Sequence, residues 1–214
     1  MTEKTPKPKY DRDKDNWYRE PPFAITPLFE AEPFHGRIVD PCAGSGNIPA
    51  AARAAGLQAD GYDLRHRPQF PLVKGRRDFL TGGGYLHGEL IGVDAIISNP
   101  PYASTGPKKL RLEEQFLVRS LEVAASKVAL LLPASWHIAS SRAAWLDDKG
   151  LYRVYFCSPR ISCPPGAMIE TGEYDFSGGG ETDYAWYVFL RGFRGPWTGH
   201  ALHTPGPKSR RRKT

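Results

Sequence analysis

The stretch "IISNPPYAS", from Ile96 to Ser104, places an amide, two prolines and an aromatic ring directly after a run of apolar residues. Pro100 and Pro101 have no backbone N–H and a fixed φ, so they end a strand and stiffen the chain that follows. The turn would hold Asn99 and Tyr102 at the strand's carboxyl end, as either a stop signal or a reaction site. We expect a reaction site formed by Asn99, Pro100, Pro101 and Tyr102, because a second motif precedes it.

The second motif is "DPCAGSGNI", Asp40 to Ile48, which reads as the end of one strand and the start of a helix. Gly44 and Gly46 allow a tight turn and a close approach of the backbone to a ligand, and a helix amino terminus offers unpaired N–H groups. Such a turn fits a nucleotide-like ligand. Glycine-rich turns also occur wherever a strand must reverse into a helix, so the turn needs support from other residues.

Acidic side chains follow the next two predicted strands. Asp63 in "GYDL" could accept hydrogen bonds from the two hydroxyls of a ribose, and Asp78 with Phe79 adds a polar and a stacking group. Ligands of open α/β sheets bind at the carboxyl edge of the strands, where these residues would meet. The turn lacks the third glycine of the dinucleotide fingerprint, so the pattern favours an adenosine-type ligand without a pyrophosphate.

Alternating strand and helix patterns must position these residues. Apolar and alternating runs predict strands over 37–41, 58–64, 75–80, 93–98, 127–133, 151–158 and 183–191. Helical periodicity and terminal glycines predict helices over 46–56, 112–126 and 135–150. We therefore predict an α/β fold with a mostly parallel sheet covered by helices. The glycine- and proline-rich segment 161–183 is expected to be a long loop.

Composition indicates one domain with a substantial core. The chain has 214 residues, of which 40% are hydrophobic and 24% charged. Cys42, Cys157 and Cys163 are too few and too irregularly spaced for a disulfide framework or a zinc site, so we predict reduced thiols and no metal. The amino terminus has no apolar signal segment, and no apolar run approaches a membrane span. We expect a soluble, cytoplasmic protein without membrane contact.

Charge is unevenly placed along the chain. Seven of the 29 basic residues and none of the 23 acidic ones lie between Arg191 and the end, which closes on "KSRRRKT". Such an arm suits phosphate contact through counterion release, although it is also typical of a solvated tail. We expect a disordered tail over 1–16, one domain over 17–195 and a basic tail over 196–214.

The two motifs, in this order, resemble the class I S-adenosylmethionine-dependent methyltransferases that act on an exocyclic amino group. The segments more closely similar to the small phage- and prophage-type adenine-N6 DNA methyltransferases are "WYREPP", "DPCAGSGNIPAAARAAG", "GYDLR", "RRDFL", "VDAIISNPPY", "SPRIS" and "TDYAWYVF". The likeness covers residues 17–195. It implies a Rossmann-like class I fold: a mostly parallel seven-stranded sheet with an antiparallel last strand and helices on both faces. In "YREP", Glu20 stands where the family more often has threonine, so the resemblance leaves open whether that segment contacts the cofactor.

The resemblance implies S-adenosylmethionine as the cofactor. Asp40 and the glycines of the turn would meet its methionine part, Asp63 its ribose hydroxyls, and Asp78 with Phe79 its adenine. The expected cofactor-binding residues are Asp40, Pro41, Cys42, Ala43, Gly44, Gly46, Asp63, Leu64, Asp78, Phe79 and Asn99.

The resemblance also implies a chemical role for "NPPY". An aromatic amine is a poor nucleophile because its lone pair is delocalised into the ring. The Asn99 side-chain oxygen and the Pro100 carbonyl can each accept one N–H bond from that amine, which favours a pyramidal nitrogen facing the sulfonium methyl. Tyr102 offers a face on which a flipped-out base could stack. Neither a covalent intermediate nor a metal ion is required.

Basic residues near the motif are candidate substrate contacts. Lys108, Lys109 and Arg111 in "ASTGPKKLR" could meet phosphates, although a solvated loop explains them equally well, and Arg160 could face the substrate from a strand end. The expected partner is nucleic acid, most directly DNA. A partner protein could supply target recognition, since we see no separate recognition domain in the sequence. The oligomeric state is left open.

Three functions remain open from the sequence. The first is methylation of adenine N6 in DNA, and the second is the same reaction on RNA adenine or on a protein glutamine. The arginine-rich arm favours nucleic acid over glutamine. The third is a catalytically silent nucleic-acid-binding scaffold of the same fold, which the substitution at Glu20 favours mildly and the intact Asn99 and Tyr102 disfavour.

Overall fold

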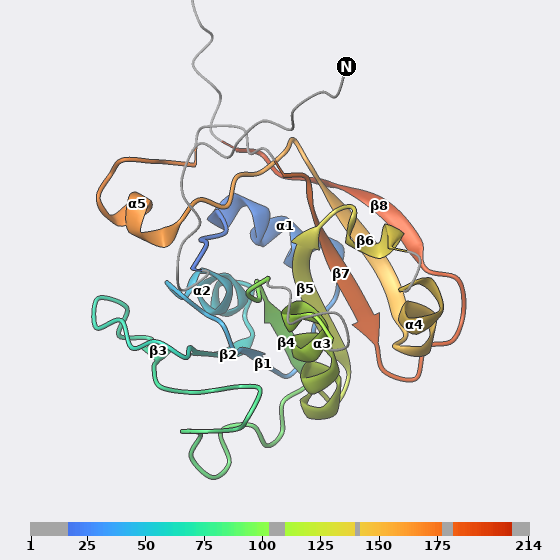
Figure 1. Cartoon of the computed structure of the whole chain (residues 1–214), viewed down its shortest axis with the longest axis horizontal. Helices are drawn as coiled ribbons and strands as arrows, with labels where there is room; N and C mark the ends of the chain where they lie inside the picture. The colour runs from blue at the N-terminus through green and yellow to red at the C-terminus, as the bar shows by residue number, and fades with distance from the viewer. Residues whose placement is uncertain (1–16, 103–109, 140–141, 177–181, 207–214) are drawn as a thin grey trace, which may run out of the picture.

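One mixed sheet forms the centre of the molecule (Figure 1). The computed structural model describes residues 17–102, 110–139, 142–176 and 182–206. Within these residues the sheet has eight strands in the order β3-β2-β1-β4-β5-β7-β6-β8. The strands are β1 (Arg37–Asp40), β2 (Gln58–Tyr62), β3 (Val73–Lys74), β4 (Ala95–Ser98), β5 (Lys127–Pro133), β6 (Leu151–Ser158), β7 (Tyr184–Leu190) and β8 (Thr198–His203).

Strand direction brings the two motifs to one edge of the sheet. Strands β1 to β5 pair in parallel, and β7 lies antiparallel between β5 and β6. Strand β1 pairs with both β2 and β4, with Val39 opposite Asp60 on one side and Ile96 on the other. The carboxyl ends of these three strands are therefore neighbours, which is where open α/β sheets bind ligands.

Helices cover both faces of the sheet (Figure 1). Leu28 of α1 and Ile48 of α2 pack against one face, while Phe116 of α3 and Leu146 of α4 pack against the other. The helices are η1 (Pro22–Ala24), α1 (Thr26–Ala31), α2 (Asn47–Ala54), α3 (Leu112–Val123), η2 (Trp136–Ile138), α4 (Ala143–Asp148) and α5 (Gly166–Glu170). Among the described residues, none of these helices has the length and apolarity to cross a lipid bilayer.

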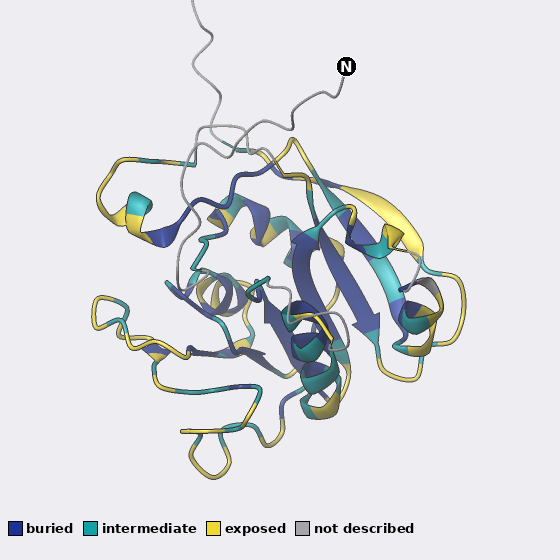
Figure 2. Ribbon diagram, viewed as in Figure 1, coloured by how far each residue is buried: buried dark blue, intermediate teal, exposed yellow. Residues whose placement is uncertain are grey.

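Strand β4 is buried along its whole length, and β5 is buried except at its two end residues (Figure 2). Successive residues of β4 point to opposite faces, so Ile97 joins the cluster beneath α1 and α2 and Ile96 the cluster beneath α3. Both positions are apolar because both faces are covered. Trp186 of β7 is fully buried, and its indole N–H donates to the Ala24 carbonyl at 3.0 Å. The core thus fixes the sheet edge that carries the motifs.

A buried ion network joins the end of α1 to the sheet. The Glu32 carboxylate is fully buried and pairs with the Lys127 ammonium of β5. It also accepts hydrogen bonds from the Arg153 guanidinium at 2.8 Å and the Tyr155 hydroxyl at 2.9 Å, both of β6. Three donors from two strands therefore hold one carboxylate.

The structure confirms the predicted α/β architecture with a mostly parallel sheet and helices on both faces, and it differs in four places, of which the connection 161–183 is described last. The third strand is Val73–Lys74, because 75–80 forms turns whose backbone bonds to Asp63 and Gly83. The helix predicted over 135–150 is split into η2 and α4. The sheet has an eighth strand, β8, in the region predicted as a tail over 196–214, where its weakly apolar sequence masks a parallel pairing with β6.

The connection predicted as a loop over 161–183 contains α5 and a buried start. Ile161 and Cys163 are buried in the core, and Tyr18 forms an isolated antiparallel bridge with Pro165. The Arg19 N–H donates to the Pro164 carbonyl at 2.9 Å. The amino-terminal segment from Trp17 is therefore held against this connection at the motif-bearing edge.

Candidate active site

A cavity of about 530 Å³ opens at the carboxyl ends of β1, β2 and β4. We call it the first cavity. Both predicted motifs contribute to its wall, as do the amino-terminal segment and α3. Its lining residues are Trp17, Tyr18, Pro41, Cys42, Asp63, Leu64, Arg65, Arg67, Arg77, Asp78, Phe79, Leu80, Thr81, Asn99, Pro101, Leu112, Gln115 and Phe116.

The glycine turn is next to this cavity, and its backbone takes left-handed conformations that favour glycine. Gly44 has φ +50° and Gly46 has φ +83°. A Cβ on Gly44 would lie 2.8 Å from the Trp17 indole nitrogen, so the backbone and the ring are in close contact. The Ala43 N–H donates to the Tyr62 carbonyl at 2.8 Å, which ties the turn to the end of β2. Glycine is required here both for the turn and for the approach of Trp17.

Asp63 fastens the glycine turn to the wall of the first cavity. One carboxylate oxygen accepts the Gly44 N–H at 2.9 Å, and the other accepts the Arg65 N–H at 2.8 Å and the Arg67 guanidinium at 2.9 Å. The Arg67 guanidinium also lies 4.1 Å from the centre of the Trp17 ring. Because the first of these oxygens accepts a single hydrogen bond, it keeps a free acceptor position for a hydroxyl group.

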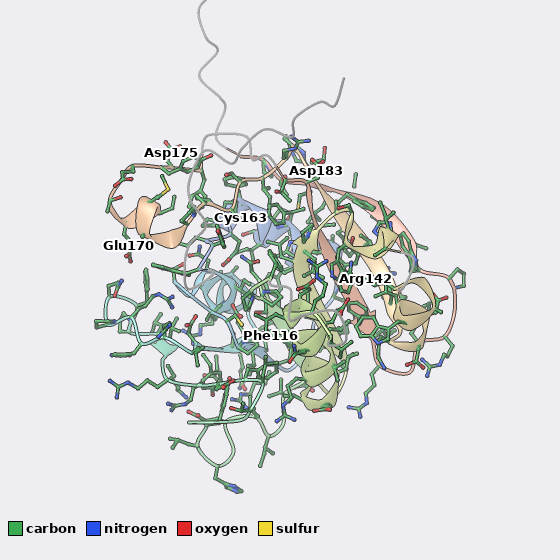
Figure 3. The ribbon with its side chains drawn as sticks, viewed as in Figure 1. Phe116, Arg142, Cys163, Glu170, Asp175 and Asp183 are labelled. Atoms are coloured by element: carbon green, nitrogen blue, oxygen red, sulfur yellow. The ribbon has the colours of Figure 1, made fainter. Side chains whose placement is uncertain are left out.

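Asp78 and Phe79 reach the cavity from a turn beyond β3. Asp78 accepts the Leu80 N–H at 3.1 Å, and Phe79 is buried with its ring stacked on Phe116 at a centroid distance of 5.8 Å. Phe116 belongs to α3 (Figure 3). The two rings form an apolar part of the cavity wall next to a carboxylate.

The Asn99 side chain is held by hydrogen bonds on both of its polar atoms. Its Nδ2 donates to the Tyr18 carbonyl and to the Glu20 carboxylate, each at 3.1 Å. Its Oδ1 lies 2.7 Å from the Tyr102 hydroxyl, whose single proton is shared between Oδ1 and the Leu131 carbonyl. An amide oxygen accepts two hydrogen bonds, so Oδ1 keeps one free position.

Asp40 and Glu20 are buried carboxyl groups close to the first cavity. Asp40 accepts the Ser98 hydroxyl at 2.7 Å and the Cys42 N–H at 3.0 Å through one oxygen, while its other oxygen is buried without a partner. Burial, with Glu20 nearby, raises the pKa of Asp40 well above its usual range. Burial likewise raises the pKa of the Cys42 thiol, so this cysteine has the character of a packed, neutral side chain.

A second cavity of about 330 Å³ has Tyr102 in its wall. Its wall includes the Arg142 guanidinium, which stacks 4.9 Å from the centre of the Trp136 ring and bonds to Glu114 at 2.7 Å (Figure 3). Glu113 is buried there and keeps one carboxylate oxygen without a partner. The lining residues of this second cavity are Tyr102, Arg111, Glu113, Pro133, Ser135, Trp136, Ala139 and Arg142.

The structure brings most of the predicted site residues to the two cavities. Those lining the first cavity are Pro41, Cys42, Asp63, Leu64, Asp78, Phe79, Asn99 and Pro101. Those beneath or beside its wall are Asp40, Ala43, Gly44, Gly46 and Pro100. Tyr102 and Arg111 line the second cavity. Arg160 instead bonds to Asp183 at 2.6 Å and lines neither cavity, and Lys108 and Lys109 lie outside the described residues.

Sequence reasoning assigned no role to several residues that line the first cavity. Trp17 and Tyr18 were expected only to begin the structured part, and Gln115 and Phe116 only to form a helix. For Trp17 and Tyr18, the sequence offered one indication, an aromatic pair directly after the charged segment 1–16. Nothing in the helix pattern distinguishes a residue that faces a cavity from one that faces the core.

Known proteins are similar to this chain in fold and not in sequence. No protein-family model and no curated protein sequence matches this chain. A class I S-adenosylmethionine-dependent methyltransferase from Listeria monocytogenes is similar in structure, with a TM-score of 0.55 and 12% identity over 85% of this chain and 63% of that one. The DrdV–DNA complex has a TM-score of 0.55 and 16% identity over 90% of this chain and 28% of that one.

A third similar structure is the ATP-dependent Type ISP restriction-modification enzyme LlaBIII bound to DNA, with a TM-score of 0.51 and 10% identity. The match covers 87% of this chain and 20% of LlaBIII. The chain therefore spans less than two thirds of the length of each of these three proteins. At these identities the likeness is one of fold: the chain has the Rossmann-like class I methyltransferase fold.

Proposed function

We propose that this protein is an S-adenosylmethionine-dependent methyltransferase that acts on the N6 amine of adenine in DNA. The observation that carries the proposal is the position of Asn99, which lines the first cavity and bonds to Tyr102 in the wall of the second. A cofactor in the first cavity and an acceptor in the second would then meet at the Asn99 side-chain oxygen.

The residues of the first cavity fit S-adenosylmethionine in charge and in chemistry. Asp63 keeps a free acceptor position for a ribose hydroxyl, and Asp78 beside Phe79 offers a polar group and an apolar surface for an adenine. The cofactor carries a positive sulfonium, and the carboxylates of Asp63 and Asp78 belong to the wall of the first cavity. Such negative groups would attract a cation.

The chain's own residues would hold and orient the acceptor amine. The free position on Asn99 Oδ1 and the Pro100 carbonyl would each accept one N–H, so that the amine lone pair faces the first cavity. When bound, S-adenosylmethionine supplies a methyl group whose S–C bond breaks, with its electron pair staying on sulfur, as the amine lone pair forms the N–C bond. The methylated nitrogen then gives one proton to water.

The acceptor that we propose is a nucleic acid. Arg111 is half exposed in the wall of the second cavity, and the basic residues of segment 208–214, which lies outside the described residues, add positive charge. Two of the similar structures are complexes with DNA. Arg111 pairs with Glu113 as Arg160 pairs with Asp183, but of the two only Arg111 lines a cavity, so phosphate contacts would come from Arg111 and from Lys108 and Lys109. A partner protein could add target recognition.

Cofactor affinity separates an enzyme from a silent scaffold of the same fold. We expect isothermal titration calorimetry to show binding of S-adenosylmethionine with a Kd in the micromolar range, which corresponds to about −8 kcal/mol. The control ligand is adenosine, which lacks the methionine part and should bind more weakly. Absence of heat and of thermal stabilisation with S-adenosylmethionine would favour the scaffold.

The glycine turn provides a sharper test of the cofactor site. Gly44→Ala should lower affinity for S-adenosylmethionine by about tenfold, because its Cβ would lie 2.8 Å from the Trp17 indole nitrogen and its φ is +50°. The matched control is Gly56→Ala, at φ +82° with no heavy atom within 4 Å of the new Cβ. This control carries the same left-handed strain without a clash, so it should lose some stability and no affinity. Equal affinity in the two variants would place the cofactor elsewhere.

A further inference from the structure

Glu20 is a buried carboxyl group in direct contact with the proposed catalytic side chain. It is 6% exposed, and its carboxylate accepts the Asn99 Nδ2–H at 3.1 Å. We infer that Glu20 is a positioning residue for methyl transfer: it fixes the Asn99 amide so that the oxygen, and not the nitrogen, faces the acceptor amine. The inference rests on the proposed function and adds a residue whose type departs from the family that the sequence resembles.

The segment that carries Glu20 is anchored from three elements. The Asn47 side chain at the start of α2 donates to the Glu20 carbonyl at 2.9 Å. The neighbouring Arg19 N–H donates to the Pro164 carbonyl, and the Gly166 N–H donates to the Trp17 carbonyl, each at 2.9 Å. The carboxylate therefore approaches Asn99 from a fixed backbone.

The orientation of the Asn99 amide follows from the count of its hydrogen-bonding groups. The amide has two N–H donors, and the Tyr18 carbonyl and the Glu20 carboxylate accept one each. Both acceptors lie on the same segment, so the nitrogen must face that segment. The oxygen then faces Tyr102. If the amide were rotated by half a turn, its oxygen would instead face the two acceptors on Tyr18 and Glu20, which is unfavourable.

Charge on Glu20 would strengthen this arrangement. A hydrogen bond to an ionised carboxylate is about twice as strong as one to a neutral acceptor, and it polarises the amide so that Oδ1 becomes a better acceptor. During transfer the amine nitrogen becomes positive. An ionised Glu20 behind Asn99 would therefore stabilise the transition state through the amide.

The surroundings of Glu20 set its ionisation in the neutral range. Burial raises the pKa of Glu20 to about 7, against the opposing effects of hydrogen bonds, including the one from Asn99, and of the Arg19 charge. The titratable groups that face Glu20 from the packed elements are Arg19, Asp40, Cys42, Tyr102 and Cys163. Because the pKa is raised, the carboxylate charge is present above pH 7 and is lost as the pH falls below it.

Steady-state kinetics on the wild-type protein and on Glu20→Gln test the inference. At pH 6, one unit below its pKa, Glu20 is about one-tenth ionised, so wild-type kcat should fall about tenfold between pH 8 and pH 6. Glutamine keeps an acceptor oxygen without a charge, so Glu20→Gln should have a flat profile at or below the wild-type value at pH 6. KM for the cofactor should change little. Parallel profiles in the two proteins would overturn the inference.

A measurement without substrate keeps the two proposals distinguishable. We expect the Asn99 side-chain ¹⁵N resonance, assigned by its loss in Asn99→Ala, to shift with a midpoint near pH 7 in the wild type and not in Glu20→Gln. In Asn99→Ala the Glu20 carboxyl should titrate at a higher pH, because a bond to its charged form is lost. An Asn99 resonance that does not titrate would overturn the inference even if methyl transfer is found. The expected shifts without transfer to any acceptor would contradict the proposed function alone.

Discussion

Asn99→Ala should lower the rate of methyl transfer by about 10²–10³-fold, which is the cost of removing one directed hydrogen-bonding group from a preorganised site. The variant removes the acceptor Oδ1 and leaves the Tyr102 hydroxyl and the Glu20 carboxylate without their shared partner. The glycine turn and Asp63 are untouched, so affinity for S-adenosylmethionine should stay within about threefold of the wild type. Single-turnover assays and calorimetry on the same preparation measure the two quantities.

The matched control is Asn47→Ala. Asn47 is also an amide that donates to the amino-terminal segment, at 2.9 Å to the Glu20 carbonyl, but it lines neither cavity. Its loss should cost stability and should change the transfer rate by less than about tenfold. If Asn99→Ala and Asn47→Ala reduced the rate equally, Asn99 would support the segment and would not contact the acceptor. A comparable loss of transfer and of cofactor affinity in Asn99→Ala would mean that its role lies in the first cavity.

Glu32→Ala should reduce the free energy of unfolding by about 3–5 kcal/mol, the range for breaking a buried ion pair from one side. The variant leaves the Lys127 ammonium and the Arg153 guanidinium without their carboxylate and removes the partner of the Tyr155 hydroxyl. The control is Glu30→Ala, an exposed glutamate two residues earlier, which should change stability by about 0.5 kcal/mol or less. Urea unfolding monitored by circular dichroism gives both values.

The same network predicts a pH dependence of stability. Burial alone would raise the pKa of Glu32, but hydrogen bonds from Lys127, Arg153 and Tyr155 hold it below its usual value. A depressed folded-state pKa stabilises the protein above the unfolded-state pKa, near 4.3, and this stabilisation is lost as the pH falls through the folded-state pKa. The stability difference between wild type and Glu32→Gln should therefore shrink below about pH 4. A constant difference down to pH 2 would contradict the network.

The strands that the sequence predicts correctly are those with a simple pattern of apolar residues. The runs over β1, β4 and β5 are apolar on both faces because helices cover both faces, so their sequence alone identifies them as parallel strands. The glycine turn and "NPPY" follow β1 and β4, which pair in the sheet, and this adjacency brings the motifs together. The class of fold and the position of the site follow from these strands.

The parts that sequence reasoning missed depend on contacts between distant segments. Strand β8 reads as a weakly apolar stretch, and only its pairing with β6 makes it a strand. The salt bridge of Arg160 with Asp183 joins the two ends of a long connection, which no local pattern shows. Glu20 stands out in sequence only as a departure from a family pattern. Its contact with Asn99 spans 79 residues and required the structure.

Identification of the methylated atom tests the central claim most directly. The purified protein is incubated with S-adenosylmethionine labelled in its methyl group and, in parallel, with DNA, RNA and a protein acceptor, and the products are digested and analysed by mass spectrometry. We expect N6-methyladenine in the DNA sample. This product should be absent with Asn99→Ala and present with Asn47→Ala. Label on a glutamine side chain, or on a nucleic-acid atom other than an exocyclic amine, would contradict it.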